Sequence, residues 1–85
     1  NSGSSANLLM VHSAAELHGW APGDEIIVPA LTWPTTVTPV IQAGYQPVFV
    51  DANLTDLSLD YEQLAKKVTD KTRAIFIAHL LGFPA

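Results

Sequence analysis

Runs of apolar residues alternate along this chain with segments of helical periodicity, and Gly, Pro, Ser or Asp marks most of the changes. Between Ser5 and about His18 the pattern predicts a helix, because Leu8, Val11 and Ala15 recur on one face. Further Leu, Met and Ala residues widen that face, so we expect the helix to be largely buried.

Capping residues indicate where the first two helices begin and end. We expect Ser4 or Ser5 to cap the first helix and Gly19 to end it in the left-handed conformation. A second helix is predicted over residues 34–44, where the opening proline suits a first helical turn. Since Pro39 lies inside this segment, the start of the helix should be kinked or irregular.

Three short apolar runs rich in β-branched residues predict strands over residues 25–28, 47–51 and 73–81. Asp60 is expected to cap a third helix that continues through Val68. Helices and strands therefore alternate, and each strand is continuously apolar. This combination favours a parallel sheet covered on both faces, which is a three-layer α/β fold.

The composition suits part of a larger body, or a subunit that buries a face against a partner. The chain has 85 residues, of which 48% are hydrophobic and only 14% are charged. A doubly wound unit would normally begin with a strand, whereas this chain begins at a helix cap. We therefore expect residues 1–85 to be a single fragment of a larger domain, whose open strand edges favour homo-oligomers.

Charge and cysteine content exclude several functional classes. The net charge is −4 and the four basic residues all lie within 66–73, which argues against a nucleic acid or an anionic membrane as partner. The absence of cysteine excludes disulfides and thiolate metal sites. No apolar run approaches a membrane span or resembles a signal peptide, so we expect a cytoplasmic protein.

Ser2, Gly3, Ser4 and Ser5 stand directly at the start of the first helix. A helix N-terminus carries unpaired N–H groups and a partial positive charge, so hydroxyls beside a glycine suit an anion, commonly phosphate. An ordinary capped helix is the plain alternative. The segment is neither a P-loop, since no Lys follows the glycine, nor a GxGxxG motif.

Trp33 follows the first predicted strand and His79 lies at the end of the third, at the edge where ligands of open parallel sheets collect. Trp33 either offers its flat face to a planar ring or packs in the core or an interface. His79 either faces the same cleft or is a structural residue. We assign no metal role to His12 and His18, which lie six apart on the first helix and share no face.

The stretches NSGSSANLL, PGDEIIVPALTWPTTV, PVFVD, DKTRAI and AHLLG carry a family resemblance over essentially the whole chain. In this order and spacing they resemble the DegT/DnrJ/EryC1/StrS group of pyridoxal-phosphate enzymes, which act on nucleotide sugars. The resemblance implies part of the large domain of a fold-type-I aminotransferase, with about three strands and three helices. It also implies that Gly3, Ser4 and Ser5 bind the cofactor phosphate and that Trp33 stacks on the pyridine ring, with His79 nearby.

In this family the aspartate that pairs with the pyridine nitrogen corresponds to a position beyond residue 85, as does the Schiff-base lysine or the histidine that replaces it. Lys66, Lys67 and Lys71 lie on a helix end and a turn, so we expect no catalytic residue in this chain and no activity from it alone.

Two branches of the family compete for the intact enzyme. The TWPTT context resembles aminotransferases that use a donor such as glutamate to aminate a nucleotide-linked 4-keto-6-deoxy sugar, which is the function we expect. NSGSSANLL, together with PTTV and the Pro and Ile-Gln that follow, also resembles the C3-dehydratases of dideoxysugar synthesis for lipopolysaccharide. The alternative of another class is a non-catalytic module that binds a phosphate or nucleotide.

Overall fold

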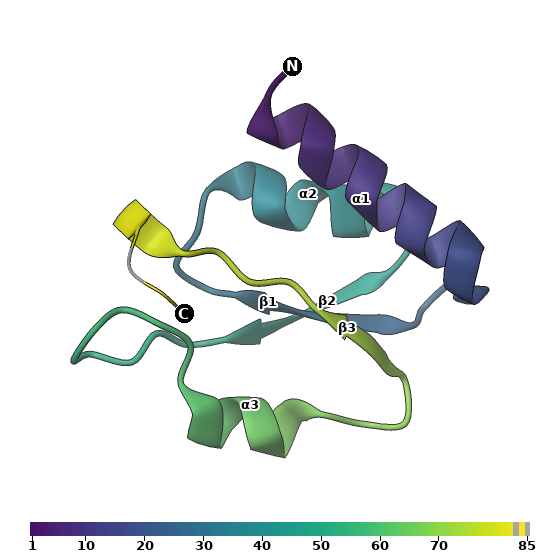
Figure 1. Ribbon diagram of the computed structural model, residues 1–85. Coiled ribbons are helices and arrows are strands. Elements are labelled where there is room, and N and C mark those ends of the chain that lie inside the picture. The colour runs from purple at the N-terminus through teal and green to yellow at the C-terminus, as the bar shows by residue number, and fades with distance from the viewer. Residues whose placement is uncertain (83, 85) are drawn as a thin grey trace.

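A computed structural model describes residues 1–82 and 84, and Figure 1 shows how the elements are arranged. A three-stranded sheet lies between two layers of helices, with two helices on one face and one on the other, which confirms the expected three-layer α/β fold. In chain order the elements are α1 (Gly3–His18), β1 (Glu25–Pro29), α2 (Pro34–Gln42), β2 (Gln46–Val50), α3 (Tyr61–Lys67), β3 (Thr72–Ile75) and the 3-10 turn η1 (Leu80–Gly82).

The strands are all parallel and lie in the order β2-β1-β3. In the register, Ile26 of β1 lies opposite Pro47 of β2 and Ala74 of β3. Parallel neighbours need crossover connections, and α2 and α3 supply them between β1 and β2 and between β2 and β3. As a result the carboxyl ends of the three strands meet at one edge of the sheet.

The core consists of two hydrophobic clusters, one on each face of the central strand β1. Beneath α1 and α2 the buried residues are Val11, Ile26, Val28 and Val40. On the opposite face they are Ile27, Val50 and Leu59, with Leu64 of α3 packed against them. Burial on both faces is the physical reason that β1 is continuously apolar.

The start of α1 differs from the sequence prediction. Ser2 is the N-cap: its backbone is extended, and its Oγ accepts a hydrogen bond from the backbone N–H of Ser5 at 3.1 Å. Ser4 and Ser5 therefore lie inside the helix, and the prediction that one of them caps it is wrong. The reason is that a cap oxygen bonds an amide two or three positions further along, and from Ser2 it bonds Ser5.

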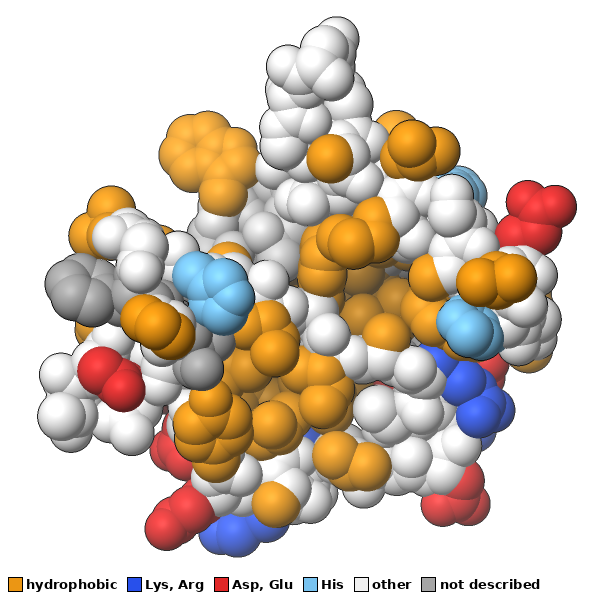
Figure 2. Space-filling view, in the orientation of Figure 1, with side chains coloured by type: hydrophobic (Ala, Val, Ile, Leu, Met, Phe, Trp, Pro, Cys, Tyr) orange, Lys and Arg blue, Asp and Glu red, His pale blue; other side chains and the backbone are white. Residues whose placement is uncertain are grey.

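The predicted burial of α1 is also wrong. Only Val11 and Ala15 are buried, whereas Leu9 is 69% and Leu17 is 79% exposed. α1 packs against α2 and the sheet on one side only, so most of its wide apolar surface has no cover within the described residues (Figure 2). Gly19 ends the helix with a left-handed φ of 66°, as predicted. In residues 1–82 and 84 no helix combines the length and apolarity needed to cross a membrane.

β3 is shorter than the predicted strand 73–81. Its pairing with β1 stops after the N–H of Phe76 donates to the carbonyl of Ile27 at 2.8 Å. In the observed register the next bond of the ladder would need an N–H from Pro29, which proline lacks. The chain therefore leaves the sheet after residue 75 while still extended.

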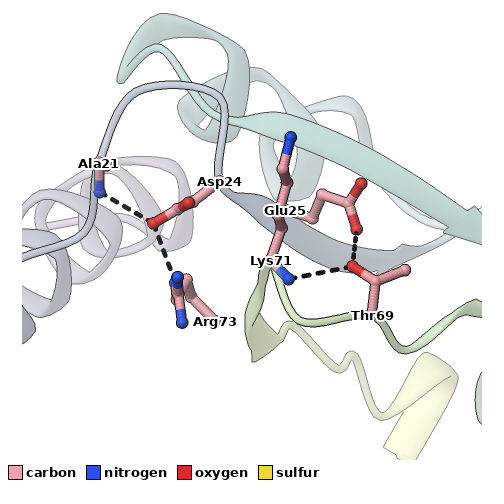
Figure 3. A network of polar contacts seen from close by, with 6 residues as sticks. All are labelled: Ala21, Asp24, Glu25, Thr69, Lys71 and Arg73. Carbon is pink, nitrogen blue, oxygen red and sulfur yellow. Dashed lines mark hydrogen bonds and ion pairs between the residues drawn. The ribbon is translucent and has the colours of Figure 1, made fainter.

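A polar network closes the amino end of the sheet (Figure 3). The Oδ2 atom of Asp24 accepts hydrogen bonds from the backbone N–H of Ala21 and from Nε of Arg73, both at 2.9 Å. The Ala21 amide and then the Arg73 guanidinium hold the pKa of Asp24 below its usual value. Nearby, the hydroxyl of Thr69 donates to the carboxylate of Glu25 at 2.7 Å.

Candidate functional site

Two helix N-termini lie at the carboxyl edge of the sheet (Figure 1). α2 follows the carboxyl end of β1 directly, so it begins at that edge. α1 delivers its C-terminus to the amino end of β1 through the turn at residues 21–24, so its N-terminus lies at the carboxyl edge as well. Ligands of open parallel sheets bind at this edge, and helix N-termini add partial positive charge to it.

The two N-termini are in direct contact through Thr35. The hydroxyl of Ser4 donates to the hydroxyl oxygen of Thr35 at 3.1 Å, and the side-chain amide of Asn7 donates to the backbone carbonyl of Thr35, also at 3.1 Å. These bonds join the first two turns of α1 to the first turn of α2. The predicted anion segment therefore contacts a residue that lies only two positions along the chain from Trp33.

The first turn of α1 presents unpaired donors to solvent. The N–H groups of Gly3 and Ser4 precede the first residue that can bond an intrahelical carbonyl, and both residues are exposed. No acidic residue occupies the first turn of α1 or of α2. A Cβ placed on Gly3 would meet no atom within 4 Å, so nothing in this chain's packing requires a glycine there. This geometry suits a phosphate group that approaches the backbone closely.

Trp33 lies at the N-cap position of α2, with an extended backbone and no side-chain cap bond. Its side chain is 74% exposed, so the alternative in which it packs in the core is wrong for this chain. An exposed indole next to two helix N-termini is available either to a planar ligand or to an interface with another part of the protein.

His79 is exposed and lies on the extended segment that leaves β3 at the carboxyl edge. Its backbone carbonyl accepts from the N–H of Gly82 at 3.1 Å, at the end of η1. The topology therefore places His79 at the same edge as Trp33 and the start of α1. Its role stays a prediction.

The basic residues lie away from this site. Lys66 and Lys67 occupy the last turn of α3, and the ammonium of Lys67 donates to the backbone carbonyl of Phe49. Lys71 belongs to the turn before β3, where its carbonyl accepts from the N–H of Glu25 at the amino end of the sheet. That none of these lysines takes a catalytic role stays a prediction.

Sequence reasoning missed Asn7 and Thr35, the residues that join the two helices. A signal was present for Thr35 but not for Asn7, because Pro39 stands four residues after Thr35. A helical carbonyl four residues before a proline has no N–H donor within its own helix, so it needs another partner.

The whole chain, residues 1–85, matches the DegT/DnrJ/EryC1/StrS aminotransferase family. The chain belongs to this family. The expected family is thereby confirmed, and solved structures in this DegT-type group superpose closely on the chain, which confirms the expected fold class as well.

Among these relatives, a dTDP-4-dehydro-2,6-dideoxy-D-glucose 3-dehydratase of Saccharopolyspora spinosa is 47% identical over 99% of this chain and 19% of its own length. The structure of the Escherichia coli GDP-4-keto-6-deoxy-D-mannose-3-dehydratase with bound hydrated PLP superposes with a TM-score of 0.91 at 45% identity, over 99% of this chain and 22% of that one. The structure of a putative sugar aminotransferase of Streptococcus pneumoniae in its PLP form superposes with a TM-score of 0.88 at 32% identity, over 100% of this chain and 21% of that one.

The chain thus spans about a fifth of the length of these DegT-type relatives. What it shares with them is one parallel α/β unit, including the edge at which α1 and α2 begin.

Proposed function

We propose that residues 1–85 form part of the cofactor-binding large domain of a pyridoxal-phosphate-dependent enzyme that acts on a nucleotide-linked keto sugar. The observation that carries the proposal is the pair of joined helix N-termini, with exposed amides at Gly3 and Ser4 and no acidic residue in either first turn. Membership of the family and the PLP named for two of the similar structures support it.

In this proposal the residues of the chain bind and orient the cofactor. The amides of Gly3 and Ser4 and the hydroxyl of Ser5 donate to its phosphate, which the helix dipole also favours, while the hydroxyl of Ser4 donates to Thr35. Trp33 covers one face of the pyridine ring, and His79 lies near the cofactor. When bound, the cofactor supplies the electron withdrawal that the sugar chemistry needs, while the Schiff-base lysine, or the histidine that replaces it in the dehydratase branch, comes from outside these residues.

Of the two family branches, we propose the 3-dehydratase for the intact protein. The relatives described as 3-dehydratases are 47% and 45% identical to this chain, whereas the putative aminotransferase is 32% identical. The aminotransferase, with glutamate as a donor, is the second candidate and rests on the TWPTT context at Trp33. A nucleotide sugar is the substrate in both, and association into homo-oligomers in the cytoplasm remains our expectation.

The test is a spectroscopic titration of the full-length protein with pyridoxal phosphate, followed by an assay with a GDP- or dTDP-linked 4-keto-6-deoxy sugar and glutamate. Glutamate is included because the exchange of the 3-hydroxyl group for hydrogen is a two-electron reduction, for which it supplies the electrons through the cofactor. We expect a saturable absorbance change and a product that has lost the 3-hydroxyl group. A product that keeps its 3-hydroxyl group and has gained an amino group from glutamate would establish the second candidate. Tighter binding of a nucleotide than of the cofactor, without turnover, would favour the non-catalytic module.

Gly3→Val places a branched side chain in front of the exposed amides and tests the phosphate position directly. Because a Cβ here meets nothing within 4 Å, we expect the variant to fold and its cofactor affinity to fall about tenfold or more. Ser13→Ala, an exposed position on α1 away from its first turn, is the matched control and should titrate like the parent protein. An unchanged cofactor affinity in Gly3→Val would contradict the proposal that the phosphate binds at the start of α1.

A further inference from the structure

One backbone carbonyl connects the two helices of the site. The carbonyl oxygen of Thr35 accepts the side-chain amide of Asn7 at 3.1 Å, across a separation of 28 residues. Asn7 is only partly exposed and lies one turn into α1, while Thr35 lies in the first turn of α2. The bond therefore acts between helices and stabilises neither helix internally.

The carbonyl is available for this bond because of Pro39. In an α-helix the carbonyl of Thr35 would accept the N–H four residues later, and that residue is Pro39, which has no N–H. Pro39 is buried in the middle of α2, so the sequence itself leaves the Thr35 carbonyl without a helical donor and available to α1. An unpaired backbone carbonyl is costly when partly buried, and Asn7 pairs it.

From this we infer that Asn7 is a positioning residue, which uses the carbonyl released by Pro39 to fix the start of α1 against the start of α2. Resting on the proposed function, the inference assigns Asn7 the task of holding the Gly3 and Ser4 amides in register with Trp33. In this inference Asn7 acts through the Thr35 carbonyl, and not by direct contact with the cofactor. The hydrogen bond from the Ser4 hydroxyl to the Thr35 hydroxyl is a second bond between the same two helices.

A simpler role for Asn7 would be to satisfy the Thr35 carbonyl and nothing more. Pro39→Ala separates the two roles, because the introduced alanine supplies the missing helical N–H. If Asn7 only satisfies the carbonyl, it becomes dispensable in the Pro39→Ala background for stability and for binding alike. If Asn7 positions α1, the loss of Asn7 in the Pro39→Ala background no longer lowers stability, but α1 and α2 still lack the hydrogen bond between them.

The experiment compares Asn7→Ala, Pro39→Ala and the double variant with the parent, all in the full-length protein. Three quantities are measured: the Tm, the Kd for pyridoxal phosphate, and amide hydrogen exchange over residues 6–12. Asn53→Ala is the matched control, since it removes a local asparagine bond, to Thr55 at 2.8 Å, in a loop away from both helix starts. It should leave the Kd and the exchange of α1 unchanged.

We expect Asn7→Ala to lower the Tm and to weaken cofactor binding about fivefold, the equivalent of one ordinary hydrogen bond. In the double variant the Tm should recover, whereas the Kd stays within about twofold of Asn7→Ala and residues 6–12 exchange faster than in the parent. Recovery of both the Tm and the Kd would overturn the inference, as would a parental Kd in Asn7→Ala.

Two further measurements keep these outcomes decisive. Should Pro39→Ala not fold, Asn7→Leu keeps the side-chain volume without the donor, and a parental Kd in that variant contradicts the positioning role. Should the parent protein not bind pyridoxal phosphate at all, the proposed function fails. Hydrogen exchange over residues 6–12 then decides the inference, because faster exchange in the double variant supports it and parental exchange refutes it.

Discussion

The two edges of the sheet use their polar residues in opposite ways. At the amino edge Asp24 is only 8% exposed and its carboxylate is bonded to Ala21 and Arg73 within the chain. At the carboxyl edge the amides that begin α1 face solvent and Trp33 is 74% exposed. One edge uses its polar groups to close the fold, while the other leaves them open to a ligand. Stability and binding should therefore be separable by mutation along a single sheet.

The largest effect is expected from breaking the closed edge. Asp24→Ala leaves the Ala21 amide and the Arg73 guanidinium without their shared acceptor, so we expect the Tm to fall by roughly 5 °C. Asp24→Asn keeps an acceptor for the Ala21 amide but loses the negative charge, so its Tm should lie between those of the parent and Asp24→Ala. The Kd for pyridoxal phosphate, measured below the new Tm, should stay within about twofold of the parent. A large change in Kd with little change in Tm would contradict the division between the edges.

At the open edge we expect the reverse, a large change in the Kd for pyridoxal phosphate with little change in stability. Trp33→Ala removes a side chain that is 74% exposed, so the free energy of unfolding should change by no more than about 0.5 kcal/mol. A lost stacking contact is worth about 0.5–1.5 kcal/mol, which corresponds to a Kd for pyridoxal phosphate raised about 2- to 13-fold. Trp33→Phe retains a flat ring and should recover much of the loss. A marked drop in Tm without a change in Kd would mean that Trp33 serves an interface instead.

How far the sequence predicts each edge depends on how local the signal is. Apolar runs and caps are local, and they predicted the alternation of helices and strands, the left-handed Gly19 and the Asp60 cap, whose carboxylate accepts from Glu62 and Gln63. The predicted length of β3 was wrong because the strand ends where Pro29, a residue of the neighbouring strand β1, lacks the N–H for the next hydrogen bond.

The site shows the same limit. Ser2, Gly3, Ser4 and Ser5 form a local pattern that pointed to the start of α1, although the capping serine was misplaced by two positions or more. The bond between Asn7 and Thr35 joins residues 28 apart, so no periodicity reveals it. Exposure of α1 also depends on what packs against it, and a wide apolar face alone could not predict that Leu9 and Leu17 remain open.

The smallest expected effect is the pH dependence of the stability that Asp24 provides at the closed edge. The bonds from Ala21 and then Arg73 hold the pKa of Asp24 below its usual 3.8, so the folded state favours the ionised carboxylate. A depressed pKa in the folded state contributes stability above the unfolded value, and this contribution disappears as the pH falls through the folded value. The Tm difference between the parent and Asp24→Asn should therefore be constant from about pH 5 to 7 and shrink below about pH 4.

Asp56 provides the internal comparison for that titration. Its pKa is also lowered, by the hydroxyl and the amide of Ser58, but Asp56 is exposed and these bonds are local to its loop. Asp56→Asn should give a smaller Tm difference from the parent, with the same sign of pH dependence, because solvent screens an exposed carboxylate. If the two variants titrate with equal amplitude, the Asp24 network contributes no more to the fold than a loop turn does. The contrast between the closed edge and the open edge would then rest on exposure alone.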